Sequence, residues 1–349
     1  MNPYILTLLL FTLGLGTTIT FASSHWLIAW MGLEINTLAI IPLMTQGHHP
    51  RAVEATTKYF LTQATAAATL LFASITNAYL SGQWNIDMMT HPLPMTMILL
   101  ALAMKVGLAP LHTWLPEVLQ GLNLTTGLIM STWQKLAPFY LLLQIPFQDQ
   151  PLLILLALAS TLVGGWGGLN QTQLRKILAY SSIAHLGWML LVMQFAPSLT
   201  LIALITYLAM TSAAFLTLKL NQATTINTLA ASWAKAPMLT AILPMVLLSL
   251  GGLPPLTGFM PKWLILQELT KQCLPLTATL AALTALLSLY FYLRLSYAMT
   301  FTMAPNNTAG VTPWRLISNQ LTTPLSTSVA LTTMLLPLTP AIAAVFAAY

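Results

Sequence analysis

The chain has 349 residues, of which 57% are hydrophobic and only 5% are charged, and its formal net charge is +6. Soluble domains carry about 25% charged residues, so this composition excludes an ordinary soluble protein and places most of the chain in a lipid bilayer. The basic residues form no run or patch, which argues against nucleic-acid binding. The single cysteine, Cys273, excludes an intrachain disulfide and a cysteine-ligated iron–sulfur cluster, and no Gly-x-Gly-x-x-Gly motif or P-loop supports nucleotide binding.

The apolar segments predict an all-α, multi-pass membrane protein. A helix needs about 20 residues to cross the bilayer. By that criterion we expect about 11 transmembrane helices, at residues 3–22, 25–45, 54–80, 95–120, 124–145, 151–169, 174–194, 198–219, 237–271, 275–299 and 323–346. The connections are too short to fold alone, so we predict a single transmembrane domain over residues 1–349. The N-terminus carries no basic, cleavable address, and we therefore expect insertion without a removed presequence.

Loop charges predict the orientation of these helices. The loops and helix ends that follow even-numbered helices carry the basic residues Arg51, Arg175, Lys176, Lys219, Lys235 and Arg315. Those that follow odd-numbered helices carry Lys271 together with the acidic Asp87 and Asp149. Because short loops rich in Lys and Arg stay on the side from which a chain is inserted, the N-terminus is predicted on the basic side and the C-terminus on the opposite side.

Two related segments interrupt the fourth and ninth predicted helices. Residues 107–111 and 252–256 share the pattern Gly-Leu-x-Pro-Leu, and each has a lysine nearby in an apolar surround. The segments are five predicted helices apart, and since five is odd, the two copies cross the membrane in opposite directions. This arrangement is typical of inverted repeats with broken helices at the membrane midplane. We predict a first repeat over about 1–145, a second over about 150–299 and one extra helix over about 323–346.

Four ionisable residues lie inside or beside the predicted helices: Glu34, Lys105, Lys135 and Lys262. A cation at the middle of a membrane helix costs roughly 2.5–3.5 kcal/mol on insertion scales, so a chain that retains several is expected to use them. A structural ion pair between Glu34 and Lys105 is one interpretation, but it accounts for only one lysine. The other is a proton relay, because a lysine removed from water gains and loses its proton near neutral pH and a nearby carboxylate reverses that effect. Arginine stays protonated and does not serve this purpose.

Proline and histidine mark the same two broken helices. Pro110 and Pro255 have no N–H group, so each frees a backbone carbonyl that is tolerated at membrane depth only in protein or beside water. His112 lies seven residues after Lys105, on the same face if the helix continues, and either relays protons or hydrogen-bonds the broken turn. His185 lies in the predicted repeat mate of the helix that holds Glu34, and we expect it either at the place of Glu34 or in a helix–helix hydrogen bond.

The remaining ionisable residues give weaker indications of a function. Lys58 and Glu54 lie near a helix end, where long side chains reach the interface. Glu117 and Glu268 end the broken helices and are expected to be caps or partner contacts. No group of His, Cys and carboxylates has metal-ligand spacing, so we predict no metal site.

The stretch Lys105-x-x-x-x-Pro110-x-His112-x-Trp114-Leu115-Pro116 resembles the signature of the antiporter-like subunits of respiratory complex I and of multisubunit sodium/proton antiporters. The resemblance covers the whole chain, including residues 180–187 and 251–259. The length is similar to that of the vertebrate mitochondrial members, which look like the longer bacterial fold without its first helices. Leu111 departs from the family pattern, in which an aromatic residue is common, and this bears on packing only.

The resemblance implies a role for each site residue. Glu34 with Lys105 is implied as a coupling pair, Lys135 as the central relay and Lys262 as the exit-side or neighbour-facing relay. His112 and His185 are implied to assist water wires. The chain is implied to be a core membrane-arm subunit of NADH:ubiquinone reductase that translocates protons across the mitochondrial inner membrane, with its N-terminus on the matrix side.

The resemblance also implies the surroundings of the chain. Electron transfer from NADH to ubiquinone is expected in other subunits, which hold the flavin and iron–sulfur clusters, and no cofactor is expected in this chain. The implied partners are the other membrane-arm subunits, including neighbouring antiporter-like subunits, accessory subunits and phospholipids such as cardiolipin. Two alternatives remain open at this point: a stand-alone cation/proton antiporter, for which carboxylate-rich cation sites are expected, and a purely structural membrane subunit with dry surroundings at its lysines.

Overall fold

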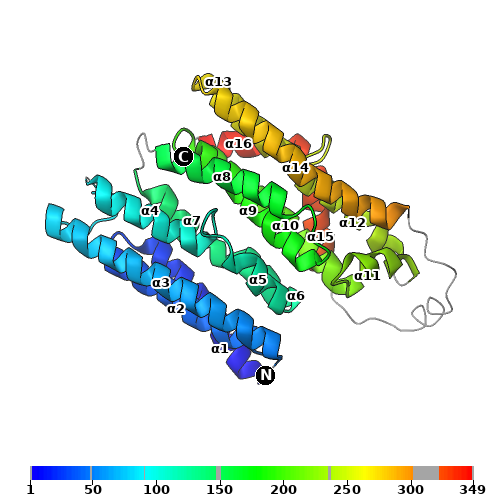
Figure 1. The fold of residues 1–349 in the computed structure, drawn as a ribbon, viewed down its shortest axis with the longest axis horizontal. Helices are drawn as coiled ribbons and strands as arrows, with labels where there is room; N and C mark the ends of the chain where they lie inside the picture. The colour runs from blue at the N-terminus through cyan, green and yellow to red at the C-terminus, as the bar shows by residue number, and fades with distance from the viewer. Residues whose placement is uncertain are drawn as a thin grey trace. The chain divides into compact units, whose positions relative to one another are not determined.

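The computed structural model describes residues 2–47, 49–89, 91–146, 151–234, 237–301 and 322–347. Throughout these ranges the regular structure is helical, with two isolated β-bridges and no strand, which confirms the all-α class. The chain separates into two compact units, Met1–Leu153 and Ile154–Tyr349 (Figure 1). The predicted loop charges Asp149, Lys235 and Arg315 lie outside the described residues.

The first unit contains helices α1 to α7. These are α1 (Pro3–Ala22), α2 (Trp26–Met44), α3 (Pro50–Ser81), α4 (Pro92–Val106), α5 (Trp114–Gly121), α6 (Leu124–Ser131) and α7 (Trp133–Gln144). Helices α1, α2 and α3 pack side by side, and α3 also packs on α4 and α5 (Figure 1). Helices α1 and α2 approach each other closely, since a methyl group on Gly16 would lie 2.9 Å from the carbonyl oxygen of Gly32. Only glycine allows the two backbones to come this close.

The second unit contains the remaining helices. These are α8 (Pro151–Gly167), α9 (Leu174–Met193), α10 (Pro197–Asn221), α11 (Ile226–Ala230), the 3-10 turn η1 (Ala231–Ala234), α12 (Pro237–Gly251), α13 (Phe259–Lys271), α14 (Pro275–Thr300), α15 (Thr323–Met334), the 3-10 turn η4 (Leu336–Leu338) and α16 (Thr339–Ala347). Helix α10 packs against α9, α12 and α15, and α12 packs against α14. The short helix α11 was not predicted, since we expected only a connection over residues 220–236.

Helix length and composition identify six helices of the described chain as able to cross a membrane, namely α1, α2, α3, α9, α10 and α14. A seventh is the pair α15 and Leu336–Ile342 if this pair, bent by 67°, counts as one span. The other predicted spans consist of shorter helices, so the predicted number of about 11 stays a prediction. The segment 124–145 was predicted to be continuous, but α6 and α7 are separate because Thr132 leaves helical geometry with φ −110° and ψ −70°.

Both interrupted helices end at a glycine in the left-handed conformation. Gly107 after α4 has φ +88°, and Gly252 after α12 has φ +79°. In each case the next leucine donates its N–H to a carbonyl five residues back: Leu108 to Ala103 at 2.9 Å, and Leu253 to Leu248 at 3.2 Å. This is the glycine-capped helix end known as the Schellman motif. We expected glycine and proline to interrupt these helices, and the structure shows that each first half-helix ends at the glycine, three residues before Pro110 or Pro255.

Candidate functional site

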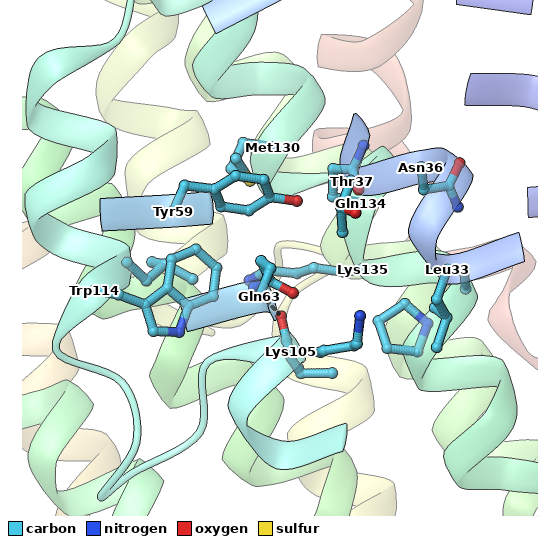
Figure 2. Close-up of a pocket in the computed structure, with 14 residues that line it drawn as sticks. Leu33, Asn36, Thr37, Tyr59, Gln63, Lys105, Trp114, Met130, Gln134 and Lys135 are labelled. Carbon is cyan, nitrogen blue, oxygen red and sulfur yellow. Dashed lines mark hydrogen bonds between the residues drawn. The ribbon is translucent and has the colours of Figure 1, made fainter. Parts of the chain in front are cut away.

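A small closed cavity lies in the first unit where α2, α3, α4 and α7 meet. It offers about 20 Å³ to the centre of a water molecule, which is enough for one ordered water. Figure 2 shows the side chains of Lys105 and Lys135 around this space, together with Tyr59 and Gln63 of α3. Both lysines are buried, with 6% and 3% of their surface exposed. The structure therefore brings two of the predicted relay residues to one cavity.

Lys105 occupies the last turn of α4, where backbone carbonyls lack a partner within the helix. Gln63 donates from Nε2 to the Lys105 carbonyl at 3.4 Å, and Trp114 of α5 donates from Nε1 to the Met104 carbonyl at 3.1 Å. Side chains from α3 and α5 thus fix the end of α4. The Lys105 ammonium itself has no hydrogen-bond partner in the described part of the chain. An unpartnered buried ammonium facing a cavity for water is suited to exchanging a proton through that water.

Glu34 lies on α2, half-buried, and its carboxylate accepts a hydrogen bond of 3.1 Å from the Thr37 hydroxyl. Among the described residues no ion pair within 4 Å joins Glu34 to Lys105. The carboxylate is close enough for its charge to act on Lys105 and on Tyr59 through space. The structure therefore holds this pair near each other without direct contact, and a direct structural ion pair is not formed.

Lys135 lies in the first turn of α7, directly after the interruption at Thr132. Its neighbour Gln134 lines the same cavity. Lys105 and Lys135 therefore both lie within one turn of a helix end. The polar wall formed by Tyr59, Gln63 and Gln134 was not singled out from the sequence. The signal available was the presence of Gln within otherwise apolar segments, where polar side chains usually face the protein interior.

Lys262 belongs to the second unit, in the first turn of α13. Its ammonium donates a hydrogen bond of 2.8 Å to the carbonyl of Gly251, the last residue of α12. A cation at this place complements the partial negative charge of a helix C-terminus. Lys262 also lines a groove of about 590 Å³ together with the aromatic residues Trp188, Phe259 and Trp263. All three predicted lysines therefore lie next to a helix break.

The two histidines lie in different settings. His112 stands in the segment between α4 and α5, and its Nδ1 is 3.2 Å from the Pro110 carbonyl oxygen, within hydrogen-bond distance. The helix does not continue from Lys105 to His112, because α4 ends at Val106, so the condition for a shared helix face is not met. The ring of His185 on α9 is centred 5.6 Å from that of Tyr207 on α10. His185 thus lies at a contact between two helices of the second unit.

In each unit an isolated β-bridge precedes the second helix and gives a reference point for comparing the two helices. His25 bridges Asn85 just before α2, and Gln173 bridges Thr225 just before α9. Counting nine residues forward from each bridge reaches Glu34 in α2 and Ser182 in α9. One of the two roles expected for His185 was the place of Glu34, and this count puts His185 one helical turn further on. Ser182 bonds to Ala179 of its own helix at 2.7 Å and to Tyr207 of α10, a helix–helix hydrogen bond.

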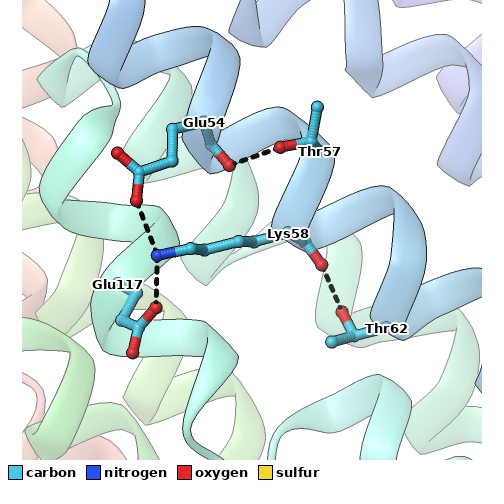
Figure 3. A network of polar contacts seen from close by, with 5 residues as sticks. All are labelled: Glu54, Thr57, Lys58, Thr62 and Glu117. Carbon is cyan, nitrogen blue, oxygen red and sulfur yellow. Dashed lines mark hydrogen bonds and ion pairs between the residues drawn. The ribbon is translucent and has the colours of Figure 1, made fainter.

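An ion triad connects α3 and α5 on the surface of the first unit (Figure 3). Lys58 contacts Glu54 at 2.7 Å and Glu117 at 2.8 Å. All three side chains are more than 40% exposed. Glu117 is therefore a partner contact, one of the two roles expected for it, while Glu268 pairs with Lys271 at 3.4 Å.

Comparison with known proteins identifies the family. Residues 23–288 match the family model described as NADH:quinone oxidoreductase/Mrp antiporter, transmembrane region, and residues 289–343 match the model for the NADH dehydrogenase subunit 2 C-terminus. The chain belongs to the NADH:quinone oxidoreductase/Mrp antiporter family.

Similar family members come from fish. The chain is 73% identical to NADH-ubiquinone oxidoreductase chain 2 of Tetraodon nigroviridis over 346 residues, 99% of each chain. It is 70% identical to the protein of the same name from Oncorhynchus mykiss, over 99% of this chain and all of that one. The expectation of a vertebrate member of this family is confirmed.

Solved structures of the family share the fold. A chain of respiratory complex I from Thermus thermophilus is 30% identical, with a TM-score of 0.84 over 97% of this chain and 79% of that chain. A chain of the Mrp complex from Dietzia is 17% identical, with a TM-score of 0.82 over 97% of this chain and 77% of that one. The second likeness concerns the fold alone. The chain therefore shares its fold with both of these membrane-complex chains.

Proposed function

We propose that the chain is a proton-translocating membrane-arm subunit of respiratory complex I in the mitochondrial inner membrane. One observation carries this proposal: the Lys105 ammonium is buried at a helix break, has no hydrogen-bond partner among the described residues and faces a cavity that Lys135 also lines. The names of the family members support the assignment to complex I. A structural subunit gains nothing from an unpartnered buried cation, which costs free energy.

In this proposal protons pass by way of lysine amines and water. Glu34 acts on Lys105 through space, so a movement of either side chain changes how strongly Lys105 holds its proton. Lys135 receives the proton across the cavity, and Lys262 is the relay of the second unit. His112 and His185 assist at the edges, His112 by holding the turn at Pro110.

The energy for proton movement comes from electron transfer between NADH and ubiquinone in other subunits. The chain is therefore an enzyme subunit of NADH:ubiquinone reductase, and we propose that it holds no flavin, iron–sulfur cluster or quinone itself. Its partners are the other membrane-arm subunits, accessory subunits and phospholipids such as cardiolipin. The bias of basic residues towards one set of loops supports an N-terminus on the matrix side and a C-terminus on the intermembrane-space side.

The test is to replace Lys105 or Lys135 by methionine in the assembled complex, reconstituted in vesicles. Methionine keeps the volume and removes the ammonium. We expect the number of protons pumped per NADH oxidised to fall and turnover to drop at least about tenfold, a barrier increase of about 1.4 kcal/mol. Both variants pumping and turning over at the parent level would refute the proposal. Thr279→Val, on the exposed face of α14, controls for substitution as such.

A further inference from the structure

The break between α12 and α13 is tied to the C-terminal helix by one buried side chain. Thr257 lies between the two half-helices and is 2% exposed. Its hydroxyl donates a hydrogen bond of 2.6 Å to the backbone carbonyl of Thr332 in α15. Thr332 is the third residue from the end of α15, so its carbonyl is one of those that lack a partner within the helix. The bond therefore satisfies both groups at once.

The residue next to Thr257 is packed equally tightly. A methyl group on Gly258 would collide with the carbonyl oxygen of Ser249 in α12 and would lie 3.0 Å from the Met210 sulfur in α10. Residues 257 and 258 thus touch α15, α12 and α10 in succession. Four residues further on, the Lys262 ammonium is bonded to Gly251 at the end of α12. The position of the break therefore fixes where Lys262 lies in the first turn of α13.

The corresponding position in the first unit carries a different side chain. Aligning the two left-handed glycines, Gly107 and Gly252, sets His112 opposite Thr257. The His112 ring contacts Pro110, within its own break.

We propose that Thr257 is a positioning residue: through its hydrogen bond to the Thr332 carbonyl, the C-terminal helix α15 holds the α12–α13 break so that Lys262 stays on the end of α12. This inference rests on the proposed function, since it assigns α15 a role in proton transfer at Lys262. Helix α15 is then part of the proton-transfer machinery, although it lies outside the predicted repeats and carries no ionisable residue.

The test compares three variants of the assembled complex in proton-tight vesicles. Thr257→Val removes the hydroxyl at nearly constant volume, and Thr257→Ser restores it. Thr332→Val is the matched control, because it removes a hydroxyl that bonds within α15, to Val329, and keeps the carbonyl that Thr257 uses. Assembly, turnover and protons pumped per NADH are measured for each.

We expect Thr257→Val to assemble and to lower pumping-coupled turnover about fivefold, the factor that corresponds to one hydrogen bond. Thr257→Ser and Thr332→Val should match the parent. Rescue by serine distinguishes positioning from general packing, which a smaller side chain would not restore. Parent-level turnover and proton yield in an assembled Thr257→Val complex would overturn the proposal.

If the valine variant fails to assemble, Thr257→Cys takes its place, because a thiol is a weak donor of similar size. A loss between those of serine and valine is expected, and parent-level pumping by the cysteine variant would overturn the proposal. The Lys105→Met variant is measured in parallel. If Lys105→Met loses proton pumping and Thr257→Val does not, only the role of α15 is refuted. Parent-level pumping in Lys105→Met refutes the proposed function itself.

Discussion

The two broken helices begin alike and end differently. In both, a left-handed glycine ends the first half-helix, the next leucine closes the same backbone bond, and a proline follows at the same distance. With Gly107 and Gly252 aligned, however, the charges do not correspond. Leu250 stands where the first unit has Lys105, and Lys262 stands where it has Glu117.

This difference separates two uses of a buried lysine. The first break keeps its lysine before the glycine, enclosed and with no hydrogen-bond partner for its ammonium within the described residues. The second places its lysine after the break, with the ammonium bonded to the end of the preceding helix and beside an open groove. Both breaks share the glycine-capped helix end. The position of the lysine before or after that glycine decides whether its ammonium bonds to a backbone carbonyl or is left to interact with water.

The largest effect on stability is expected from placing a lysine before the glycine of the second break, as in the first break. Leu250 is fully buried. Leu250→Lys adds a cation there, and we expect a destabilisation of about 3 kcal/mol, the cost of a charge at the centre of a membrane helix. The amount of assembled complex and its thermal denaturation midpoint report this loss. Leu250→Met is the control and should cost less than about 1.5 kcal/mol. Normal assembly of Leu250→Lys would show that the second break accepts a lysine as readily as the first.

A smaller effect is expected from alanine at either capping glycine. The left-handed conformation costs a residue with a Cβ about 1–2 kcal/mol, so Gly107→Ala and Gly252→Ala should lower the denaturation midpoint similarly. Their neighbours differ: the new methyl group meets Leu115 at 2.9 Å in the first break, but the Lys262 side chain at 2.9 Å in the second. Only Gly252→Ala displaces a relay lysine. The number of protons pumped per NADH should therefore fall further in Gly252→Ala than in Gly107→Ala at the same loss of stability.

The control for this pair is Gly14→Ala in α1, where nothing lies within 4 Å of the added methyl group and the helix gains from alanine. Equal proton yields from Gly107→Ala and Gly252→Ala at matched stability would contradict the difference drawn between the two breaks.

The smallest effect is expected at the ion triad. Glu117 occupies the position that corresponds to Lys262, but its carboxylate is about half exposed and bonded to Lys58 at the surface. Exposed ion pairs contribute little and are screened by salt. Glu117→Gln should therefore leave turnover and proton yield close to the parent, at low and at high salt. A loss comparable to that of Lys105→Met would give the triad a place in the proton path.

Local patterns in the sequence predicted much of this arrangement. The apolar composition indicated the helical membrane fold, and the repeated Gly-Leu-x-Pro-Leu located both breaks. The lysines stood out because hydrocarbon surrounds them. What could not be predicted depends on contacts between distant residues. The bond from Thr257 to Thr332 joins positions 75 apart, and that from Lys58 to Glu117 joins positions 59 apart.

At two further places the helix ends in the structure differ from those predicted, for local reasons that the sequence did not reveal. The break was predicted in the segment Gly107–Pro110, and the structure shows that the glycine cap ends the helix before the proline is reached. The interruption at Thr132 has no glycine or proline beside it, but the hydroxyls of Ser131 and Thr132 both bond to the Leu128 carbonyl there, a pattern that bends helices. It lies next to Lys135, so the cavity geometry depends on a feature that only the tertiary structure defines.

The most direct test is a high-resolution map of the assembled membrane arm around Lys105. The account predicts an ordered water in the cavity between Lys105, Gln63 and Lys135, and a Glu34 carboxylate that contacts Lys105 in some states of the enzyme and not in others. A dry cavity in every state, with Glu34 and Lys105 in a permanent ion pair, would contradict it.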